Sequence, residues 1–338
     1  MGSTPSACRR RRRRAVRSWR LSADGKGVVM LPRDLREGTR KAAQSQGRKF
    51  DQRLAKGEKR NRKRMATVAA VYTVAPYVRS PEQIVRTLAP HHEPAAPRPP
   101  VAHKRVWASL EKSPEEVLGE AFAEGLRRDP KREKTWVGLV DGNATQLKLL
   151  EKFARRHRIE LTIVLDVMHV AEYLWSASTA FNDEASRRRE LWVGERLLNV
   201  LRGRAAQVAA GMRRSATLRG LSADRRRTVD AAARYPLNHQ HYMHYDRYLA
   251  AGMPIATGVI EGACRHLVCD RMDGAARWSL AGAEAVLRVR ALRSSGDFEH
   301  YWNYHVAREY ERNHVSRYAA GKVVPVKRRG RPALRLVK

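Results

Sequence analysis

Acidic residues are scarce in this chain of 338 residues, which has 34 aspartates and glutamates against 68 lysines and arginines. The net charge of +34 excludes a predominantly acidic surface and favours a polyanionic partner, of which nucleic acid is the first candidate. Because acids are so few, those that directly follow predicted strands carry more information than they would in a balanced sequence.

Cysteines and long apolar runs are also in short supply. The three cysteines, Cys8, Cys264 and Cys269, form no C-x-x-C pair, which excludes a disulfide framework and indicates a reducing, cytoplasmic compartment. Cys264 and His266 resemble half of a zinc site, but no second pair of ligands accompanies them. No apolar run approaches the ~20 residues of a membrane span. The charged N-terminus also lacks the apolar segment of a secretory signal, so we expect no membrane partner.

Arginine-rich segments occupy both ends of the chain. Residues 1–17 contain six consecutive arginines, Arg9–Arg14, and are typical of low-complexity sequence that does not fold alone. Residues 321–338 form a basic tail, in which Arg329 and Arg331 belong to an R-G-R-P segment similar to the core of an AT-hook. The arginines of such a segment enter narrow A·T minor grooves. A generic basic tail is the alternative interpretation.

Two short apolar runs, Val137–Val140 and Leu161–Leu165, stand at the centre of the chain, and each stops at an aspartate, Asp141 or Asp166. Continuous apolar runs separated by a helical pattern predict parallel strands that are buried on both faces. Both strands would end at the same edge of the sheet, where open α/β folds keep their sites. Two neighbouring carboxylates there are costly unless a cation accepts them, which favours a metal-using enzyme.

The rest of the sequence predicts an α/β protein with a long helical segment. Residues 19–31 alternate about Asp24-Gly25-Lys26-Gly27, a pattern typical of a β-hairpin. The other predicted elements are a helix over 35–54, a strand over 65–78, a proline-rich linker over 89–103, a helix over 114–128, helices from 167 to 234, a break at 236–245, and helices over 257–266, 279–293 and 298–314.

The three aspartates also have plain structural explanations. Asp24 is followed by glycine, as is common in hairpin turns. Asp141 is followed by glycine too, but it ends a buried run instead of joining two alternating strands. Asp166 has the features of the N-cap of the next helix.

Two further residues combine with these acids. His169 lies one turn into the helix that begins after Asp166, on the same face as that aspartate. Glu261 has Arg265 four residues later, which is consistent with a helical ion pair. The small neighbours of Glu261 in GVIEGA would instead let another backbone or a substrate approach it closely.

Six segments, in this order, together resemble one family: SADGKGVVM, GEKRNRKRMATVAAVY, VDGN, LDVMHVAEYLW, PIATGVIEGACRH and ARWSLAGAEAVLRVRALRSSGDFEHYW. They are similar to segments of bacterial ISKra-type insertion-sequence transposases, which are DDE enzymes related to the Mutator group. The resemblance covers about Leu21 to Tyr318. It implies an RNase H-like core, a mixed sheet with flanking helices, that is interrupted by an all-α insertion before the last acid.

The resemblance also implies which residues carry the chemistry. The first acid corresponds to Asp24, the second to Asp141 and the third to Glu261, and together they would hold two Mg²⁺ or Mn²⁺ ions. Asp166 and His169 match a Cys/Asp-x-x-His motif that Mutator-like enzymes place between the second acid and the glutamate. Whether Asp141 or Asp166 is the second metal acid stays open at this point.

The implied partners are double-stranded DNA, both transposon ends and target, and further copies of the chain in a homodimer or higher oligomer on the bacterial nucleoid. We expect five regions: 1–17, 18–170 with the first part of the core, a helical insertion over 171–255, the core completion over 256–320, and the tail. The candidate DNA-binding residues are Arg60, Arg62, Lys63, Arg64, Arg265, Arg271, Arg277, Arg329 and Arg331.

The sequence departs from the family in one respect, because full-length relatives carry a substantial region before the first acid. Only 23 residues precede Asp24 here, so we expect a truncated or frame-shifted start. Two other functions fit the same residues. One is a metal-dependent nuclease that cleaves DNA without joining it, and the other is a basic DNA-binding remnant without catalysis.

Overall fold

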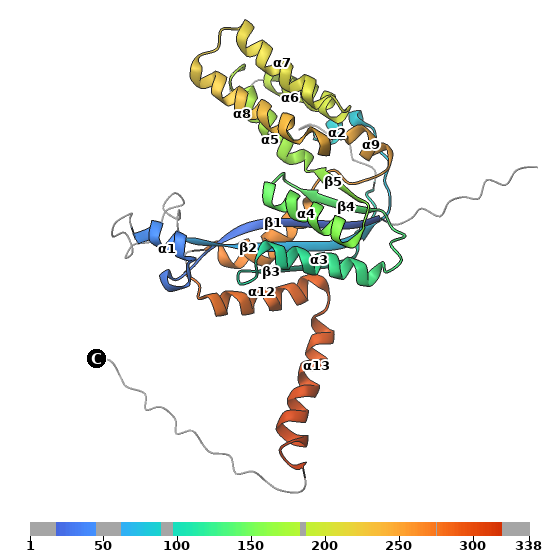
Figure 1. Ribbon diagram of the computed structural model, residues 1–338, viewed down its shortest axis with the longest axis vertical. Helices are drawn as coiled ribbons and strands as arrows, with labels where there is room; N and C mark the ends of the chain where they lie inside the picture. Colours follow the sequence, from blue (N-terminus) through green and yellow to red (C-terminus); the bar gives the residue numbers. More distant parts are fainter. Residues whose placement is uncertain (1–17, 45–61, 89–96, 183–186, 275, 320–338) are drawn as a thin grey trace, which may run out of the picture.

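A five-stranded mixed sheet with helices on both faces forms the body of the molecule (Figure 1). The computed structural model describes residues 18–44, 62–88, 97–182, 187–274 and 276–319. The strand order is β3-β2-β1-β4-β5, in which β1, β4 and β5 are parallel and β2 is antiparallel to both of its neighbours. The strands are β1 (Ser18–Val29), β2 (Lys63–Val74), β3 (Ala102–Ser109), β4 (Trp136–Val140) and β5 (Leu161–Leu165). The predicted α/β class is therefore confirmed.

Thirteen α-helices lie among the described residues. They are α1 (Glu37–Gln44), α2 (Pro81–Leu88), α3 (Pro114–Arg128), α4 (Ala144–His157), α5 (Val167–Ser178), α6 (Arg187–Leu201), α7 (Ala205–Leu218), α8 (Ala223–His239), α9 (Tyr245–Ala250), α10 (Gly258–Ala263), α11 (Asp270–Met272), α12 (Leu280–Ser295) and α13 (Phe298–Tyr310). Two π-helical turns, η4 (Cys264–Cys269) and η5 (Glu311–Val315), extend α10 and α13. No helix among these described residues is long and apolar enough to cross a membrane.

The predicted hairpin about Asp24–Gly27 is wrong, because β1 runs straight through these residues. Every residue of β1 has a partner on β2, and the register places Gly25 opposite Thr67 and Gly27 opposite Met65. Pairing along the whole of this long, apolar β2 satisfies backbone groups that a two-residue turn would leave without a strand partner. Asp24 is therefore a strand residue and not a turn residue.

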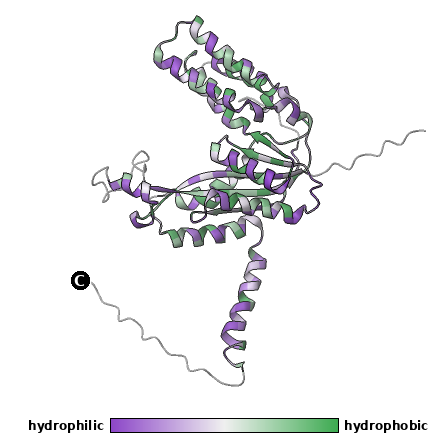
Figure 2. Ribbon diagram, in the orientation of Figure 1, coloured by the Kyte–Doolittle hydropathy of each residue, from purple (hydrophilic) through white to green (hydrophobic). Residues whose placement is uncertain are grey.

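The predicted central unit is confirmed. β4 is buried along its length and lies between β1 and β5, parallel to both. The turn after β4 starts α4 at Asn143, whose side-chain oxygen accepts hydrogen bonds from the backbone N–H groups of Thr145 and Gln146. Such a cap satisfies donors that the first helical turn cannot pair internally. Figure 2 shows the hydrophobic character of β4 and β5.

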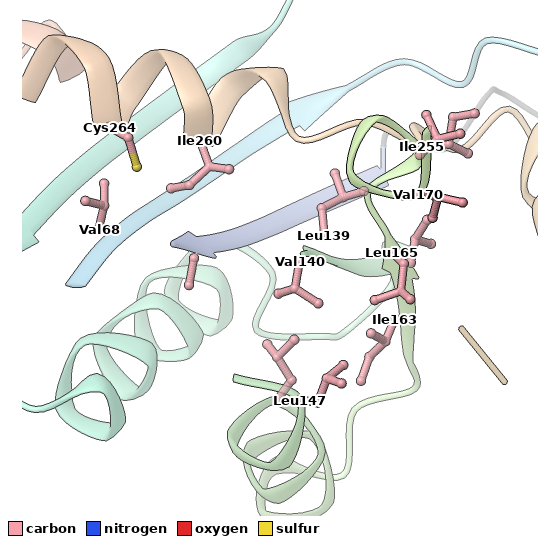
Figure 3. Packing of buried hydrophobic residues seen from close by; sticks show 14 of the residues in the cluster. Val68, Leu139, Val140, Leu147, Ile163, Leu165, Val170, Ile255, Ile260 and Cys264 are labelled. Atoms are coloured by element: carbon pink, nitrogen blue, oxygen red, sulfur yellow. The ribbon is translucent and has the colours of Figure 1, made fainter. Parts of the chain in front are cut away.

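Two helical layers cover the sheet. α3 and α4 lie on one face, and α3 begins with a capping box, in which Ser113 and Glu116 bond each other's backbone N–H. α10 and η4 lie on the opposite face, where Ile260 and Cys264 point onto the sheet, whereas Leu147 of α4 points onto it from the other side (Figure 3). The strand ends are thus held between two apolar layers.

The edge strand β3 was not predicted, since its first part falls in the proline-rich linker expected over 89–103. Its opening residues are His103, Lys104 and Arg105, so it lacks the apolar run that marks a buried strand. It is held on one side by β2 and on the other by Ser295 of α12, whose hydroxyl both accepts from the N–H of Val106 and donates to its carbonyl.

Helices α5 to α9 form a bundle beyond β5, and α2 packs against α6 (Figure 1). The break predicted at 236–245 is only partly correct. α8 continues through Pro236 to His239 before a short 3-10 turn, so the proline lies inside a helix. Burial of Tyr235 and Pro236 within the bundle outweighs the local cost of the missing N–H.

Candidate active site

Three aspartates lie level with one another across β1, β4 and β5. β1 pairs with β4 up to Ser22 and Leu139, and the same parallel register, continued by two residues, places Asp24 level with Asp141. The register of β4 with β5 then brings Asp141 level with Asp166. Neighbouring strands are about 4.8 Å apart, so the backbone sets three carboxyl groups in a short row. This row is the centre of the candidate site.

Asp166 is the most enclosed of the three, with only 3% of its surface exposed. One carboxylate oxygen accepts the N–H of Met168 at 2.9 Å, so Asp166 is the N-cap of α5, as its position suggested. The other oxygen accepts the hydroxyl of Thr257. Burial raises the pKa of Asp166 above its ordinary value of 3.8, the hydrogen bonds from Thr257 and Met168 oppose that rise, and the charge of Glu261 adds to it.

Glu261 comes to the row from the opposite helical layer. It lies on α10 and is exposed, and its Oε1 is 3.2 Å from the Thr257 hydroxyl that also contacts Asp166. A hydroxyl has one proton to donate. Thr257 therefore links the two acids, and it can turn between them. Glu261, which is far from Asp166 in the sequence, thus lies close to it in the fold.

Asp24 is held by the same helical layer as Glu261. Its Oδ2 accepts a hydrogen bond from the Cys264 thiol at 3.2 Å, and its Oδ1 accepts the N–H of Gly25 at 2.6 Å. Burial raises the pKa of the Cys264 thiol, and the Asp24 carboxylate raises it further, so the thiol keeps its proton and acts as a donor. Cys264 follows Glu261 by three residues, so one helical turn carries both the glutamate and the group that orients Asp24.

Lys26 supplies the nearest positive charge to Asp24. Its Nζ lies 3.4 Å from Asp24 Oδ2. Burial acts to lower the pKa of Lys26, but Asp24, Cys264 and Cys269 together outweigh it and the pKa is raised, so the ammonium is retained. In this conformation the Lys26 ammonium is the cation that contacts Asp24.

Asp141 sits in a tight turn that the bundle closes. Its Oδ1 accepts the N–H of Asn143 at 3.0 Å, and its carbonyl accepts the hydroxyl of Tyr235, on α8, at 2.7 Å. The following residue, Gly142, has φ +92°, and a Cβ placed there would lie 2.8 Å from the Tyr235 oxygen. Only glycine fits both the backbone and the contact. Tyr235 therefore fastens the helical bundle to the end of β4.

His169 belongs to an aromatic group beside the row and not to the row itself. Its ring meets Tyr173 and Tyr235 edge-on at 5.2 and 5.4 Å between centroids, and Tyr173 stacks on Tyr235 at 4.3 Å. Its Nδ1 lies 3.1 Å from Oε2 of Glu172, a neighbour on its own helix. These contacts make His169 part of the joint between α5 and α8.

The chemistry of the donors fits hard divalent cations such as Mg²⁺ and Mn²⁺, which prefer carboxylate oxygens. Within the described ranges, however, no three side chains of His, Cys, Asp or Glu come close enough together in this conformation to hold one ion. Asp24 is engaged by Cys264 and Lys26, and Asp166 by Thr257. The backbone of the row can therefore stay fixed, and rotation of the side chains would bring these carboxylates onto a cation.

The basic residues predicted to bind DNA around the start of β2 are mostly engaged in the fold. Arg62 is 9% exposed, and Arg64 donates to the carbonyls of Leu110 and Asp34. Burial lowers the pKa of Arg64, and Arg36 lowers it further. Lys63 is half-buried, 4.0 Å from Asp273. Arg62 and Arg64 thus position β2 and its loops, and Arg60 lies outside the described residues.

The basic residues after Glu261 are better placed for phosphates. Arg265 is largely exposed and only 3.6 Å from Asp270 at its Nε, and Arg271 is exposed with its guanidinium over the Trp278 ring at 4.9 Å. Arg277 is half-buried beside them. Arg329 and Arg331 lie outside the described residues, as does the AT-hook prediction.

Sequence reasoning missed four residues of this site: Lys26, Tyr235, Thr257 and Cys264. Lys26 is two residues after Asp24, and in a strand two such residues lie on the same face. The interpretation of the segment as a turn hid this relation. Cys264 was considered only as a zinc ligand, although its spacing of three from Glu261 predicts a shared helix face. No local pattern predicts the role of Tyr235, because its partner Asp141 is 94 residues away in the sequence.

Neither a protein-family model, a curated protein nor a solved structure matches this chain. The acids, their register and the groups that hold them are thus the grounds for assigning a function. They point to chemistry in which several carboxylates act together beside a strongly basic surface.

Proposed function

We propose that this chain is a DDE transposase, which cleaves DNA and transfers its strand in a reaction that depends on divalent metal ions. The observation that carries the proposal is the row of acids, Asp24 level with Asp141, with Glu261 brought over it from α10. In a chain with half as many acids as bases, such a concentration of carboxylates is costly unless a cation is held between them.

The arrangement of the sheet supports an RNase H-like core. A mixed sheet with helices on both faces, here in the order β3-β2-β1-β4-β5, agrees with the mixed sheet and flanking helices that the resemblance to ISKra-type transposases implies. The helices α5 to α9 come between Asp166 and Glu261 in the chain, which is where that family's all-α insertion would lie. We therefore assign the bundle to the insertion.

Asp141 is the better candidate for the second metal acid. It directly follows β4, the strand beside the one that carries Asp24, whereas Asp166 is one strand further away. Both oxygens of Asp166 are already used, one to cap α5 and the other to hold Thr257. We assign Asp24, Asp141 and Glu261 as ligands and Asp166 as the residue that positions Thr257 and, through it, Glu261.

Two divalent ions held by these acids would activate the attacking oxygen and stabilise the leaving oxygen of an in-line phosphodiester displacement. The chain's own residues prepare that chemistry. Cys264 and Lys26 both hold Oδ2 of Asp24, and Lys26 neutralises this carboxylate until a stronger cation displaces it. Arg265 and Arg271 are exposed on the same helical segment as Glu261, where they would hold the phosphates that flank the reacting one.

The test is joining of a pre-cut DNA end in the presence of Mg²⁺. A labelled duplex with a free 3′-hydroxyl, taken from the DNA that flanks the gene, is incubated with supercoiled target and the full-length chain. We expect covalent transfer of the label to the target, and no transfer by Asp141→Ala or Glu261→Ala chains that bind the same DNA equally well. Metal-dependent nicking without transfer would instead support a nuclease. DNA binding with neither reaction would support a non-catalytic remnant.

A further inference from the structure

The helix α13 leaves the body of the molecule at the end opposite to the helical bundle and stands away from it (Figure 1). It continues through η5, and neither element buries a single side chain. Seven large apolar or aromatic side chains are exposed along this segment: Tyr301, Trp302, Tyr304, Val306, Tyr310, Val315 and Tyr318. We define the α13 segment as residues 298–318.

A helix of this kind is not expected to persist by itself. Single helices shorter than about 12–15 residues are marginal in water even when they are rich in alanine. The α13 segment is rich in aromatic residues, histidine and asparagine, which are weaker helix formers. Its aromatic rings stack on one another along the helix, as Phe298 does on Trp302 and Tyr301 does on His305, with ring centroids 6.2 and 5.9 Å apart. A surface of this composition is normally covered by a partner.

Charge decides what that partner is. The α13 segment has three glutamates and three arginines, so its formal charge is zero in a chain of +34. Two of the arginines are already paired within the segment, Arg308 with Glu311 at 2.7 Å and Arg312 with Glu309 at 2.6 Å. A polyanion such as DNA would find few free cations here. The basic bodies of two copies of this chain repel each other, and the neutral α13 segment is the surface on which that repulsion is least.

A cavity of about 590 Å³ at the base of α13 extends this apolar surface. Val106 and Trp107 of the edge strand, Leu292 of α12 and Tyr301 of α13 contribute to its lining. Such a cavity offers room for a large side chain from a second molecule. α13 and two elements that line this cavity, β3 and α12, lie away from β5 and the bundle (Figure 1), so burial of this surface would leave the acids open to DNA.

We propose that the α13 segment is a dimerisation helix, which packs against the α13 segment of a second copy in a two-fold arrangement. In such a pair the same residues are buried on both chains. The exposed aromatic side chains then become a shared core, and the neutral helix keeps the two basic bodies apart. This inference does not depend on the proposed transposase activity, because it needs neither metal nor DNA.

The test is the mass of the full chain, freed of nucleic acid, by sedimentation equilibrium at 0.1 and 0.5 M salt. We expect twice the chain mass of 38.5 kDa at about 10 µM. The dimer should tighten at higher salt, because salt screens the repulsion between the bodies. Association through DNA would do the opposite. Backbone amide exchange in 298–310 should slow as the protein concentration rises.

The disrupting variant is Trp302→Glu with Val306→Glu, one helical turn apart on one face and 49% and 50% exposed. Because neither side chain contacts the core, the thermal unfolding of the body should not change. The matched control is Leu191→Glu with Leu218→Glu, which are 60% and 77% exposed on the bundle. We expect the first variant to raise the dimer dissociation constant by at least 30-fold, which is typical when central interface side chains are removed, and the control to leave it unchanged. A monomeric wild type, an undisturbed α13 variant, or equal dissociation of the control would overturn the proposal.

Discussion

Gly142 is the point at which the helical bundle is fastened to the end of β4, and its replacement by alanine tests that joint. The backbone there has φ +92°, a conformation that costs a residue with a Cβ about 1–2 kcal/mol. The added Cβ would also lie 2.8 Å from the Tyr235 oxygen and 3.2 Å from its ring. Tyr235 must then move, which breaks its 2.7 Å hydrogen bond to the Asp141 carbonyl at a further cost of about 1–2 kcal/mol. Gly142→Ala should therefore destabilise the chain by about 2–4 kcal/mol.

Gly296→Ala is the matched control for this substitution. Gly296 also has a positive φ, +79°, but no atom lies within 4 Å of the position that its Cβ would take. This control should show only the backbone cost of about 1–2 kcal/mol. The difference between the two variants isolates the effect of Tyr235.

Urea denaturation, followed by far-UV circular dichroism, gives the free energy of unfolding of each variant. Tyr235→Phe alone should cost about 1 kcal/mol, since it removes the same hydrogen bond. The double variant Gly142→Ala with Tyr235→Phe should cost less than the sum of the two single variants, because both act on one interaction. Equal destabilisation by Gly142→Ala and Gly296→Ala, or strict additivity in the double variant, would refute the reasoning.

Three further predictions concern the acids and the tail. Cys264→Ala should weaken Mn²⁺ binding, measured by calorimetry, by roughly 2- to 10-fold because it removes one hydrogen bond to Asp24. Cys264→Ser keeps a donor and should restore the binding. If Cys264 acted through packing alone, serine would be the worse replacement. Burial raises the pKa of Asp166 above 3.8, so without metal the folded chain should lose stability as the pH rises through that raised pKa. Asp166→Asn cannot ionise, so its unfolding free energy should lack this pH-dependent loss. Parallel curves of unfolding free energy for the two chains between pH 4 and 8 would contradict the prediction. Deletion of residues 327–338 should reduce the slope of log DNA affinity against log salt by about 0.9 for each phosphate that the tail binds, and it should affect A·T-rich duplexes more than G·C-rich ones if the tail acts as an AT-hook.

The parts of the fold that could be predicted are those whose signal is local. The runs ending at Asp141 and Asp166 are apolar throughout and are separated by a clear helical pattern, so both strands, their direction and the proximity of the two acids were predicted correctly. The helix predicted over 114–128 is α3 for the same reason, because its capping residues, Ser113 and Glu116, are only three residues apart.

The parts that could not be predicted depend on pairing at a distance. Asp24-Gly25 has the local features of a hairpin turn, and only its partner strand, some forty residues later, keeps it extended. β3 begins with charged residues because it is an edge strand, so its apolar signal is weak. Arg64 was expected to bind DNA, yet its guanidinium donates to the carbonyls of Asp34 and Leu110, which are far from it in the sequence.

The candidate site divides in the same way. Asp24, Asp141 and Glu261 were selected by resemblance and, for Asp141, by its position after an apolar run, and the register of the strands brings the two aspartates level. The groups that hold them, Cys264 and Tyr235, come from elements that are distant in the chain, and no spacing in the sequence connects them to their partners.

The most direct test of the central claim compares the acids one at a time in the joining reaction. Asp141→Asn and Asp166→Asn are made in the full chain, and transfer of a pre-cut DNA end to target is measured in Mg²⁺ alongside DNA affinity. If Asp141 holds the metal and Asp166 positions Thr257, Asp141→Asn should abolish joining, whereas Asp166→Asn should retain a measurable rate, both with unchanged DNA affinity. Full joining by Asp141→Asn would contradict the assignment of the row of acids as the catalytic centre.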